Sequence, residues 1–424
     1  MSSTKPLLSL APYRYLISAQ LISNLGDWLS IMAIFTMAGL KWNATPLEMS
    51  LILLSLAVPM TVLGPVAGVL ADRTERKVLM IGSDLARVFV MLLFISASEV
   101  WHVYILMFLL GVFSALFNPA KNGKLKEIVP DEHMQQANSI SSIIENGTKI
   151  VGPAAGGALM TFIGTDVIYM IDAATFLLSA LLLMKLPVRK HSRKQIDKDK
   201  VKTAFWSELS ESLTFIKGVP FIFYGLFLTF VAMFVIQLAD SQFVTLFREL
   251  KEVSPSLLGA VMTSSGAGFL VSGLLLSKLE IKKPAAAMAA GIIVLGAGFG
   301  LVGYLTYLQA PSPYFWASAV VFATTFGAGF MFIPFQTGVQ QKTPVEMSGR
   351  VFGTVGSVTM FAAIIGPLAS GIIGNMTGVL PLFLTSGFGL VFIGMVALIL
   401  RRHLEKDEEH GTESIRRAQG TTTT

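Results

Sequence analysis

The sequence predicts an all-α membrane protein with twelve transmembrane helices arranged as two six-helix halves. Three observations predict this fold. The composition is 53% hydrophobic and only 14% charged, which is too apolar for a soluble domain. Several charge-free runs reach the roughly 20 residues that a helix needs to cross a bilayer. Two long segments of the chain also align with each other, which indicates two related halves.

Each predicted span is a mostly apolar run that can form a helix, because unsatisfied backbone groups are costly in lipid. The first half has spans near 15–40, 49–71, 78–97, 102–120, 138–163 and 167–186. The second half has spans near 218–246 and 253–277, two within 284–341 and two within 351–400. Turn-like segments at 309–314 and 374–381 divide the last two runs.

The lysines and arginines near the ends of the spans predict the orientation. With a cytoplasmic N-terminus, the outer loops hold only Lys41, Arg248 and Lys251, and the other loop cations face inward, including the cluster in 189–202. We therefore expect both termini in the cytoplasm. The same asymmetry explains the net charge of +6, so no nucleic-acid partner is expected.

The chain divides into an N-terminal half (1–187), a polar cytoplasmic linker (188–206), a C-terminal half (207–402) and a polar cytoplasmic tail (403–424). Residues 129–157 align with residues 343–371 without a gap, so that Gly152 and Pro153 match Gly366 and Pro367. Both segments begin the fifth helix of their half. This arrangement predicts a parallel repeat about an axis along the membrane normal.

Two motifs and several shorter segments carry a resemblance to the major facilitator superfamily of transporters. The loop after the second span resembles the family's loop motif through Gly64, Gly68, Asp72, Arg73, Arg76 and Lys77. The fifth span resembles the motif of the antiporter branches through Gly147, Gly152, Pro153, Gly156 and Gly157. The segments "SNLGDW" (23–28) and "NPAK" (118–121) resemble a bacterial subgroup of macrolide-efflux and enterobactin-exporter-like proteins. The resemblance implies the major facilitator fold and transport by alternating access.

The loop after the second span is expected to form an inner gate. The resemblance implies that Asp72 meets the start of the eleventh helix near 348–351, where the helix dipole favours a carboxylate. The alternative is a solvated loop acid. Asp84 and Arg87 are expected to stabilise the inner boundary beside this loop. Gly64 and Gly68 are four residues apart, which lets the second helix approach a neighbour closely.

Charged residues inside the predicted spans are candidates for proton coupling or substrate binding, because charge at the bilayer centre is costly. Asp27 lies about 18 Å along its helix from Tyr15, which is near mid-depth. A carboxyl shielded at that depth can serve as a proton carrier. The alternative is a fixed partner for Lys149 or for a backbone group.

Three further acids and one lysine are candidates for proton coupling or substrate binding, each with an alternative role. Glu145 and Lys149 are one helical turn apart and can pair with each other, or they can take part in transport. Asp240 is a further coupling candidate. For Asp240 and for Asp172, anchoring at the membrane interface is an equal alternative.

The aromatic segments at 234–243 and 322–335 would suit one wall of a cavity for an amphipathic solute. Packing in the core or against lipid is the alternative for each phenylalanine and methionine. The glycine–proline pairs at 152–153 and 366–367 permit either bending during transport or ordinary close packing of helices.

Taken together, the residues and the resemblance predict a proton-coupled antiporter in the bacterial inner membrane. It would export lipophilic or amphipathic compounds of the drug, macrolide or siderophore kind. We expect a monomer among membrane lipids, driven by the proton motive force, with no cofactor and no metal. No enzymatic activity is expected, since the histidines fall in loops or the tail without ligand spacing. The alternatives are an importer or uniporter of the same fold, a lipid scramblase or a signalling membrane protein.

Overall fold

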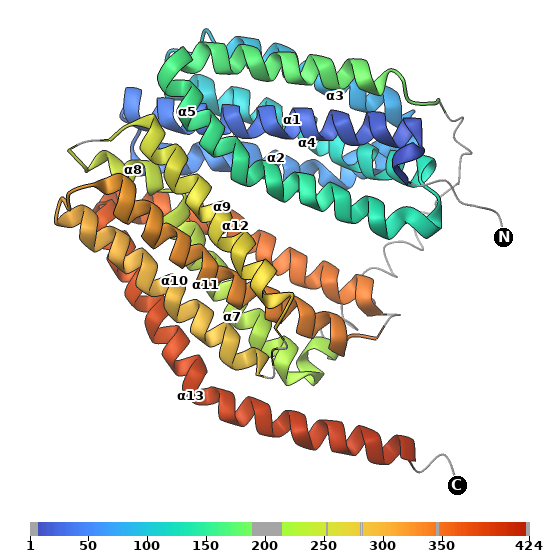
Figure 1. Ribbon diagram of the computed structural model, residues 1–424, viewed down its shortest axis with the longest axis vertical. Coiled ribbons are helices and arrows are strands. Elements are labelled where there is room, and N and C mark those ends of the chain that lie inside the picture. The colour runs from blue at the N-terminus through green and yellow to red at the C-terminus, as the bar shows by residue number, and fades with distance from the viewer. Residues whose placement is uncertain are drawn as a thin grey trace. The chain divides into compact units, whose positions relative to one another are not determined.

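The computed structural model describes residues 7–188, 214–344 and 347–420, apart from residues 252, 280 and 282. The chain forms two compact units, each a bundle of helices (Figure 1). The first unit comprises residues 1–194 together with 241–266, and the second comprises 195–240 together with 267–424.

The first unit contains the helices of the first half of the chain. They are η1 (Leu7–Ser9), α1 (Ala11–Thr36), η2 (Met37–Lys41), α2 (Pro46–Arg73), α3 (Arg76–Phe94), α4 (Val100–Ile128), η3 (Asp131–His133) and α5 (Met134–Leu183). Two later elements join them, α8 (Phe243–Arg248) and the start of α9 (Pro255–Leu276). The main helix pairs are α1 with α5, α2 with α4, and α3 with both α4 and α5.

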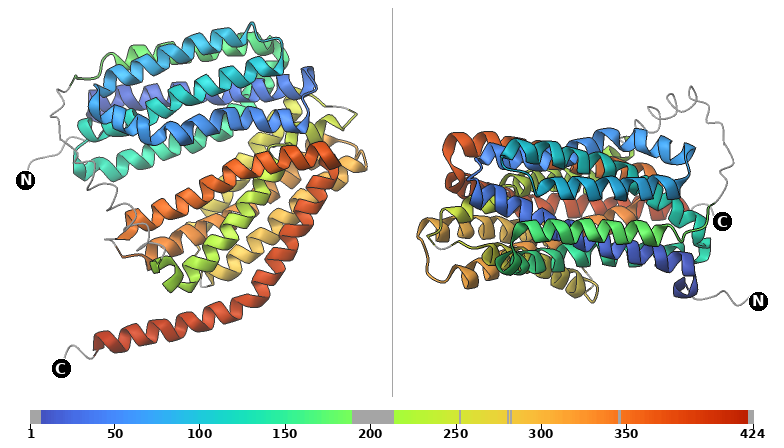
Figure 2. Two further views of the ribbon diagram at one scale, coloured as in Figure 1. Left: turned by 180° about the vertical axis from the view of Figure 1, so that it is seen from behind. Right: turned by 90° about the horizontal axis from the view of Figure 1, so that it is seen from above.

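The second unit contains α7 (Pro220–Asp240), the end of α9, α10 (Pro284–Tyr307), α11 (Pro313–Lys342), α12 (Ser348–Thr377) and α13 (Val379–Gly420). Here α10 packs against α11 and α13, and α12 packs against α7. The C-terminal part of α13 continues past the bundle as a helix (Figure 2). Each unit has its own buried core, around Tyr13 and Phe117 in the first and around Ile222 and Phe335 in the second.

Ten helical segments of the described chain are long and apolar enough to cross a membrane. They correspond to ten of the twelve predicted spans. The other two predicted spans, 78–97 and 138–163, are also helical, as α3 and the first part of α5. Both carry charged residues within the span, such as Arg87 in α3 and Lys149 in α5. The structure thus confirms an all-helical membrane fold.

Three local features explain where helices begin, break and end. Thr45 caps α2: its hydroxyl accepts from Glu48 N–H, and the Glu48 carboxylate accepts from Thr45 N–H at 2.7 Å. Gly164 divides α5 into two helices through a φ of 77°, which favours glycine. By contrast, Pro119 lies inside α4, which continues to Ile128. The predicted end at 120 is therefore wrong, because α4 continues through the lysines after residue 120 and its far end packs in the core.

The repeated glycine–proline pairs occupy equivalent packing positions in the two units. A Cβ added at Gly152 of α5 would overlap the Trp28 side chain of α1. A Cβ added at Gly366 of α12 would lie 2.5 Å from the Cβ of Gln237 in α7. In each unit the fifth helix of the half therefore approaches the first helix at a position where only glycine fits. Close packing thus explains the glycine of each pair.

Candidate functional site

A cavity of about 680 Å³ lies within the first unit. Its walls come from α1, α2, α3, α4 and both parts of α5. Apolar side chains, including Trp28, Met60, Met91 and Phe117, share these walls with charged and amide groups. The volume falls in the range of small-molecule sites, and the mixed lining suits an amphipathic ligand.

Asp27 of α1 lines this cavity and is partly buried. Its carboxyl is within electrostatic reach of Arg87 and Asp84 of α3. Lys149 lines the same cavity but has an exposed side chain and no ion-pair partner among the described residues. The structure thus brings Asp27 and Lys149 to one cavity without joining them in an ion pair.

Asp84 and Arg87 form a buried ion pair next to the cavity. Arg87 Nη2 lies 2.6 Å from Asp84 Oδ1, and the Ser179 hydroxyl donates to Asp84 Oδ2 at 2.7 Å. The guanidinium also lies 4.5 Å from the ring centres of both Phe117 and Phe176. These contacts hold the Arg87 charge in a fixed position. Arg87 lines the cavity together with Asp27.

Glu145 pairs with Lys121 of α4, not with Lys149. Lys121 Nζ lies 2.9 Å from Glu145 Oε1, and Gln20 Nε2 donates to the same oxygen at 3.1 Å. This contact joins α1, α4 and α5 at the cavity. Of the two roles considered for Glu145 and Lys149, direct pairing with each other is thereby removed.

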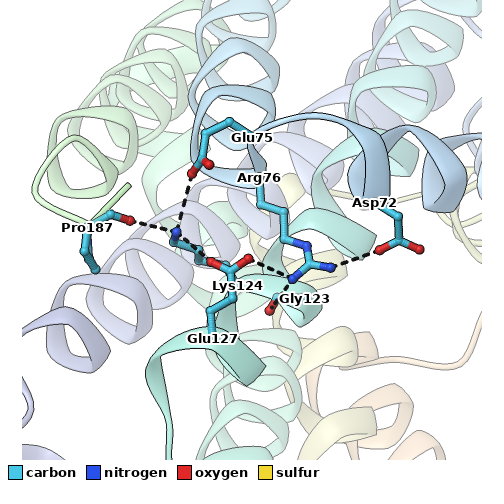
Figure 3. Close-up of polar contacts among 7 residues, drawn as sticks. All are labelled: Asp72, Glu75, Arg76, Gly123, Lys124, Glu127 and Pro187. Carbon is cyan, nitrogen blue, oxygen red and sulfur yellow. Dashed lines mark hydrogen bonds and ion pairs between the residues drawn. The ribbon is translucent and has the colours of Figure 1, made fainter. Parts of the chain in front are cut away.

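The loop between α2 and α3 carries a second charged site (Figure 3), and none of its charged residues lines the cavity. Arg76 bridges two acids, with Nη2 2.9 Å from Asp72 Oδ1 and Nη1 2.8 Å from Glu127 Oε1. Lys124 of α4 is fully buried and lies 2.8 Å from Glu127 Oε2 and 3.5 Å from Glu75 Oε1. We call Asp72, Glu75, Arg76, Lys124 and Glu127 the loop cluster.

The loop cluster is also tied to the chain that follows α5. Lys124 Nζ donates to the carbonyl oxygen of Pro187 at 2.7 Å (Figure 3). Lys77 donates to the carbonyl oxygens of Met184 at 2.5 Å and Leu186 at 2.8 Å. Two lysines thus fix the segment that precedes the predicted linker.

Arg73 is exposed, and the Asp72 side chain is 60% exposed. The side chains of residues 348–350 lie outside the described part of the structure. The contact of Asp72 with that helix end therefore stays a prediction. Within the described residues, Asp72 has Arg76 as its ion-pair partner.

The glycines of the two motifs behave differently from one another. A Cβ added at Gly64 or Gly68 would meet no described atom within 4 Å, so the close approach of a neighbouring helix there stays a prediction. Both glycines are partly buried on α2. Gly147 is equally open, whereas Gly156 packs against α1 and Gly157 packs against Gly259 at the start of α9.

None of the remaining candidates lines the cavity. Asp240 ends α7 with an exposed side chain. In the aromatic segment 322–335, Met331 and Phe335 are fully buried in the packing of α11. Packing is thus the role that the structure supports for these two side chains.

Sequence reasoning missed the buried positions of Lys121 and Lys124. Both were assigned to a cytoplasmic loop, because the fourth span was predicted to end at residue 120. In the structure α4 extends through both lysines, and both are buried. The apolar residues at 125 and 128 each follow one of these lysines by one helical turn, and this spacing was the available signal that the helix continues.

Comparison with known proteins adds the family context. The model of the Major Facilitator Superfamily matches residues 16–367. The uncharacterized MFS-type transporter YfiS of Bacillus subtilis (strain 168) is 39% identical over 414 residues, covering 96% of this chain and 97% of that protein. Macrolide efflux protein A of Streptococcus pyogenes is 26% identical, covering 80% of this chain and 84% of that protein. The multidrug efflux pump Tap of Mycolicibacterium fortuitum is 25% identical, covering 93% and 97%.

Solved structures show the same fold at low identity. A bacterial homologue of the human lysosomal transporter Spinster superposes with a TM-score of 0.65 at 13% identity, covering 95% of this chain and 97% of that chain. The nucleoside transporter NupG superposes with a TM-score of 0.68 at 14% identity, covering 94% and 99%.

Proposed function

Because the chain belongs to the Major Facilitator Superfamily, we propose that this multi-spanning membrane transporter is a proton-coupled exporter of lipophilic or amphipathic small molecules. The observation that carries the proposal is the cavity of the first unit. Its walls combine Asp27 and Lys149 with Trp28, Met91 and Phe117. Such a lining binds an apolar body through its apolar side chains and a polar or charged group through its ionisable ones.

The relatives favour export over import. Macrolide efflux protein A and the multidrug efflux pump Tap are efflux proteins by name, and each aligns with most of this chain. We propose that the transporter lies in the bacterial inner membrane with both termini in the cytoplasm, as the distribution of basic residues predicts. There it would act as a monomer and exchange protons for its substrate.

In the proposed mechanism, Asp27 takes up a proton when the cavity faces one side and releases it when the cavity faces the other. A carboxylate surrounded by apolar walls is costly, so binding of a proton and binding of a substrate at the same cavity influence each other. The loop cluster would control the inner side of the cavity. The Arg87–Asp84 ion pair would keep its charges while Asp27 gains and loses a proton.

The experiment measures proton movement in proteoliposomes that hold the purified full-length protein. A panel of macrolides, other lipophilic drugs and siderophore-like compounds is added under an imposed proton gradient. Wild type is compared with Asp27→Asn and with Asp166→Asn, whose acid lies just after Gly164 and outside the cavity lining. We expect substrate-dependent proton flux in wild type and in Asp166→Asn, and its loss in Asp27→Asn with substrate binding retained.

Other outcomes would point to the alternative functions. Unchanged flux in Asp27→Asn removes this residue from coupling. Substrate movement without proton movement favours a uniporter, and uptake along with protons favours an importer. Movement of phospholipid analogues without any gradient favours a scramblase.

A further inference from the structure

Asp172 in the second part of α5 lines the cavity described above. Its side chain is 1% exposed, and it lines the cavity with Asp27 and Arg87. The mechanism above leaves this buried acid without a role. Its position next to the proposed proton carrier therefore needs a physical explanation.

Asp172 is held directly against α1, one residue away from Asp27. A Cβ added at Gly26 would overlap both Asp172 Oδ1 and the Thr175 hydroxyl, so a glycine at 26 is what admits the carboxyl. Thr175 donates to Asp172 Oδ1 at 3.0 Å. The Ser30 hydroxyl lies beside this carboxyl but outside hydrogen-bonding geometry, so Oδ2 has no donor among the described residues.

The charged groups around the two acids do not neutralise them. The ionisable residues of the surrounding helices are Asp84 and Arg87 on α3, Lys121 on α4, and Glu145 and Lys149 on α5. The lining residues from α2, Leu56 and Met60, are uncharged. Lys121 is paired with Glu145, and Lys149 has an exposed side chain. Asp27 and Asp172 interact electrostatically with each other and with Arg87.

Arg87 is therefore the cation that all three nearby acids share. Its guanidinium is already bound to Asp84 at 2.6 Å and fixed between two phenylalanine rings. Three ionised carboxylates around one guanidinium would leave excess negative charge in a poorly solvated site, which is strongly unfavourable. Two neighbouring carboxyls in such a site share a proton more readily than both ionise.

We propose that Asp27 and Asp172 together form the proton-carrying pair of the transporter. The pair holds one proton while it is shielded from water, and Asp84 remains the ionised partner of Arg87. Water on one side supplies the proton to a carboxylate oxygen, and the same O–H releases it to water on the other side. This proposal rests on the proposed function for its role in transport, but the shared proton is a property of the protein alone.

Infrared spectroscopy of the full-length protein in lipid vesicles tests the shared proton without any substrate. A protonated carboxyl has a carbonyl stretching band that disappears as the group ionises. We expect this band in wild type and in Asp166→Asn, and its loss or a displaced pH midpoint in both Asp27→Asn and Asp172→Asn. An unchanged band and midpoint in Asp172→Asn would overturn the proposal. Asp172→Glu, which keeps the carboxyl, should restore the band if Asp172→Asn proves poorly folded.

Transport measurements then distinguish a failure of the proton-carrying pair from a failure of the proposed function. With a substrate found in the panel, Asp172→Asn should lose uphill, gradient-driven transport and retain substrate counterflow, which needs no net proton movement. If wild type moves no protons with any substrate, the proposed function fails. The infrared result still shows whether Asp27 and Asp172 share a proton. If wild type moves protons and Asp172→Asn moves them equally well, the pair is refuted and the function stands.

Discussion

The Arg76 guanidinium lies 2.8 Å from the Glu127 carboxylate, and this ion pair joins the start of α3 to the end of α4 (Figure 3). Both side chains are mostly buried, at 17% and 11% exposure. An ion pair in such a place is costly to break, because Arg76 and Lys124 together balance the Glu127 carboxylate and removing Arg76 leaves that balance to Lys124. The contact of Arg76 with the largely exposed Asp72 should matter much less.

Arg76→Ala should therefore destabilise the protein by about 1.5–3 kcal/mol, the range for hydrogen bonds to charged groups. The measurement is thermal unfolding in detergent. Arg73→Ala is the matched control, since Arg73 lies in the same loop with an exposed side chain. Equal melting temperatures for the two variants would contradict this account of the loop cluster.

Lys124→Met should be more damaging than Arg76→Ala. Lys124 is fully buried and contacts Glu127, Glu75 and the Pro187 carbonyl oxygen. Removing its charge leaves Glu75 and a carbonyl oxygen without this donor, at a cost of about 3–5 kcal/mol. Lys126→Met, two residues further along α4 and exposed, should melt like wild type. A melting temperature for Lys124→Met within the error of that control would refute the prediction.

Gly157→Val should force α5 away from the start of α9. A Cβ at Gly157 would lie 2.6 Å from Gly259 Cα and 2.8 Å from the Pro255 carbonyl oxygen. Backbone atoms cannot move aside cheaply, so we expect a loss of about 1–3 kcal/mol and impaired transport. Gly147→Val controls for helix propensity, because the same change there meets open space. The two variants are compared by melting temperature and by transport rate.

Arg248 should hold the α8 segment against η2. It donates to the carbonyl oxygens of Gly39 at 3.2 Å and Ala44 at 2.9 Å, and nearby Gln242 donates to Ser50 at 3.0 Å. Since the chain has no cysteine, Ser50→Cys provides a single labelling site at a buried position. Arg248→Ala should speed maleimide labelling of this cysteine. Lys41→Ala, at an exposed position, should not, and equal labelling rates would exclude the restraint.

The predicted orientation can be measured with the same cysteine-free background. Lys41→Cys and Lys126→Cys place a thiol at exposed positions near opposite ends of the first unit's helices. A membrane-impermeant reagent added to intact cells should label the first variant and should label the second only after permeabilisation. The reverse pattern would place the N-terminus outside, against the distribution of basic residues.

The sequence determined the helices and most of their boundaries. A transmembrane span is a local property, because about 20 apolar residues in a row satisfy the requirement of the bilayer whatever their neighbours are. Gly164 and the capping box at Thr45 are likewise readable from short segments. The fourth span was predicted to end too early because the lysines after residue 120 were assigned to a loop, whereas α4 continues through them to Ile128.

The tertiary structure alone decided which charges meet. Glu145 has a lysine one turn away in its own helix but pairs with Lys121 of α4. The Ser179 hydroxyl of α5 donates to Asp84, a contact that no sequence pattern predicts. Asp172 reaches α1 because Gly26 leaves room for its carboxyl. These outcomes depend on how each helix is rotated and how closely its neighbours approach. Hydrophobicity along one helix determines its span, but contacts between helices determine which of its polar groups come together.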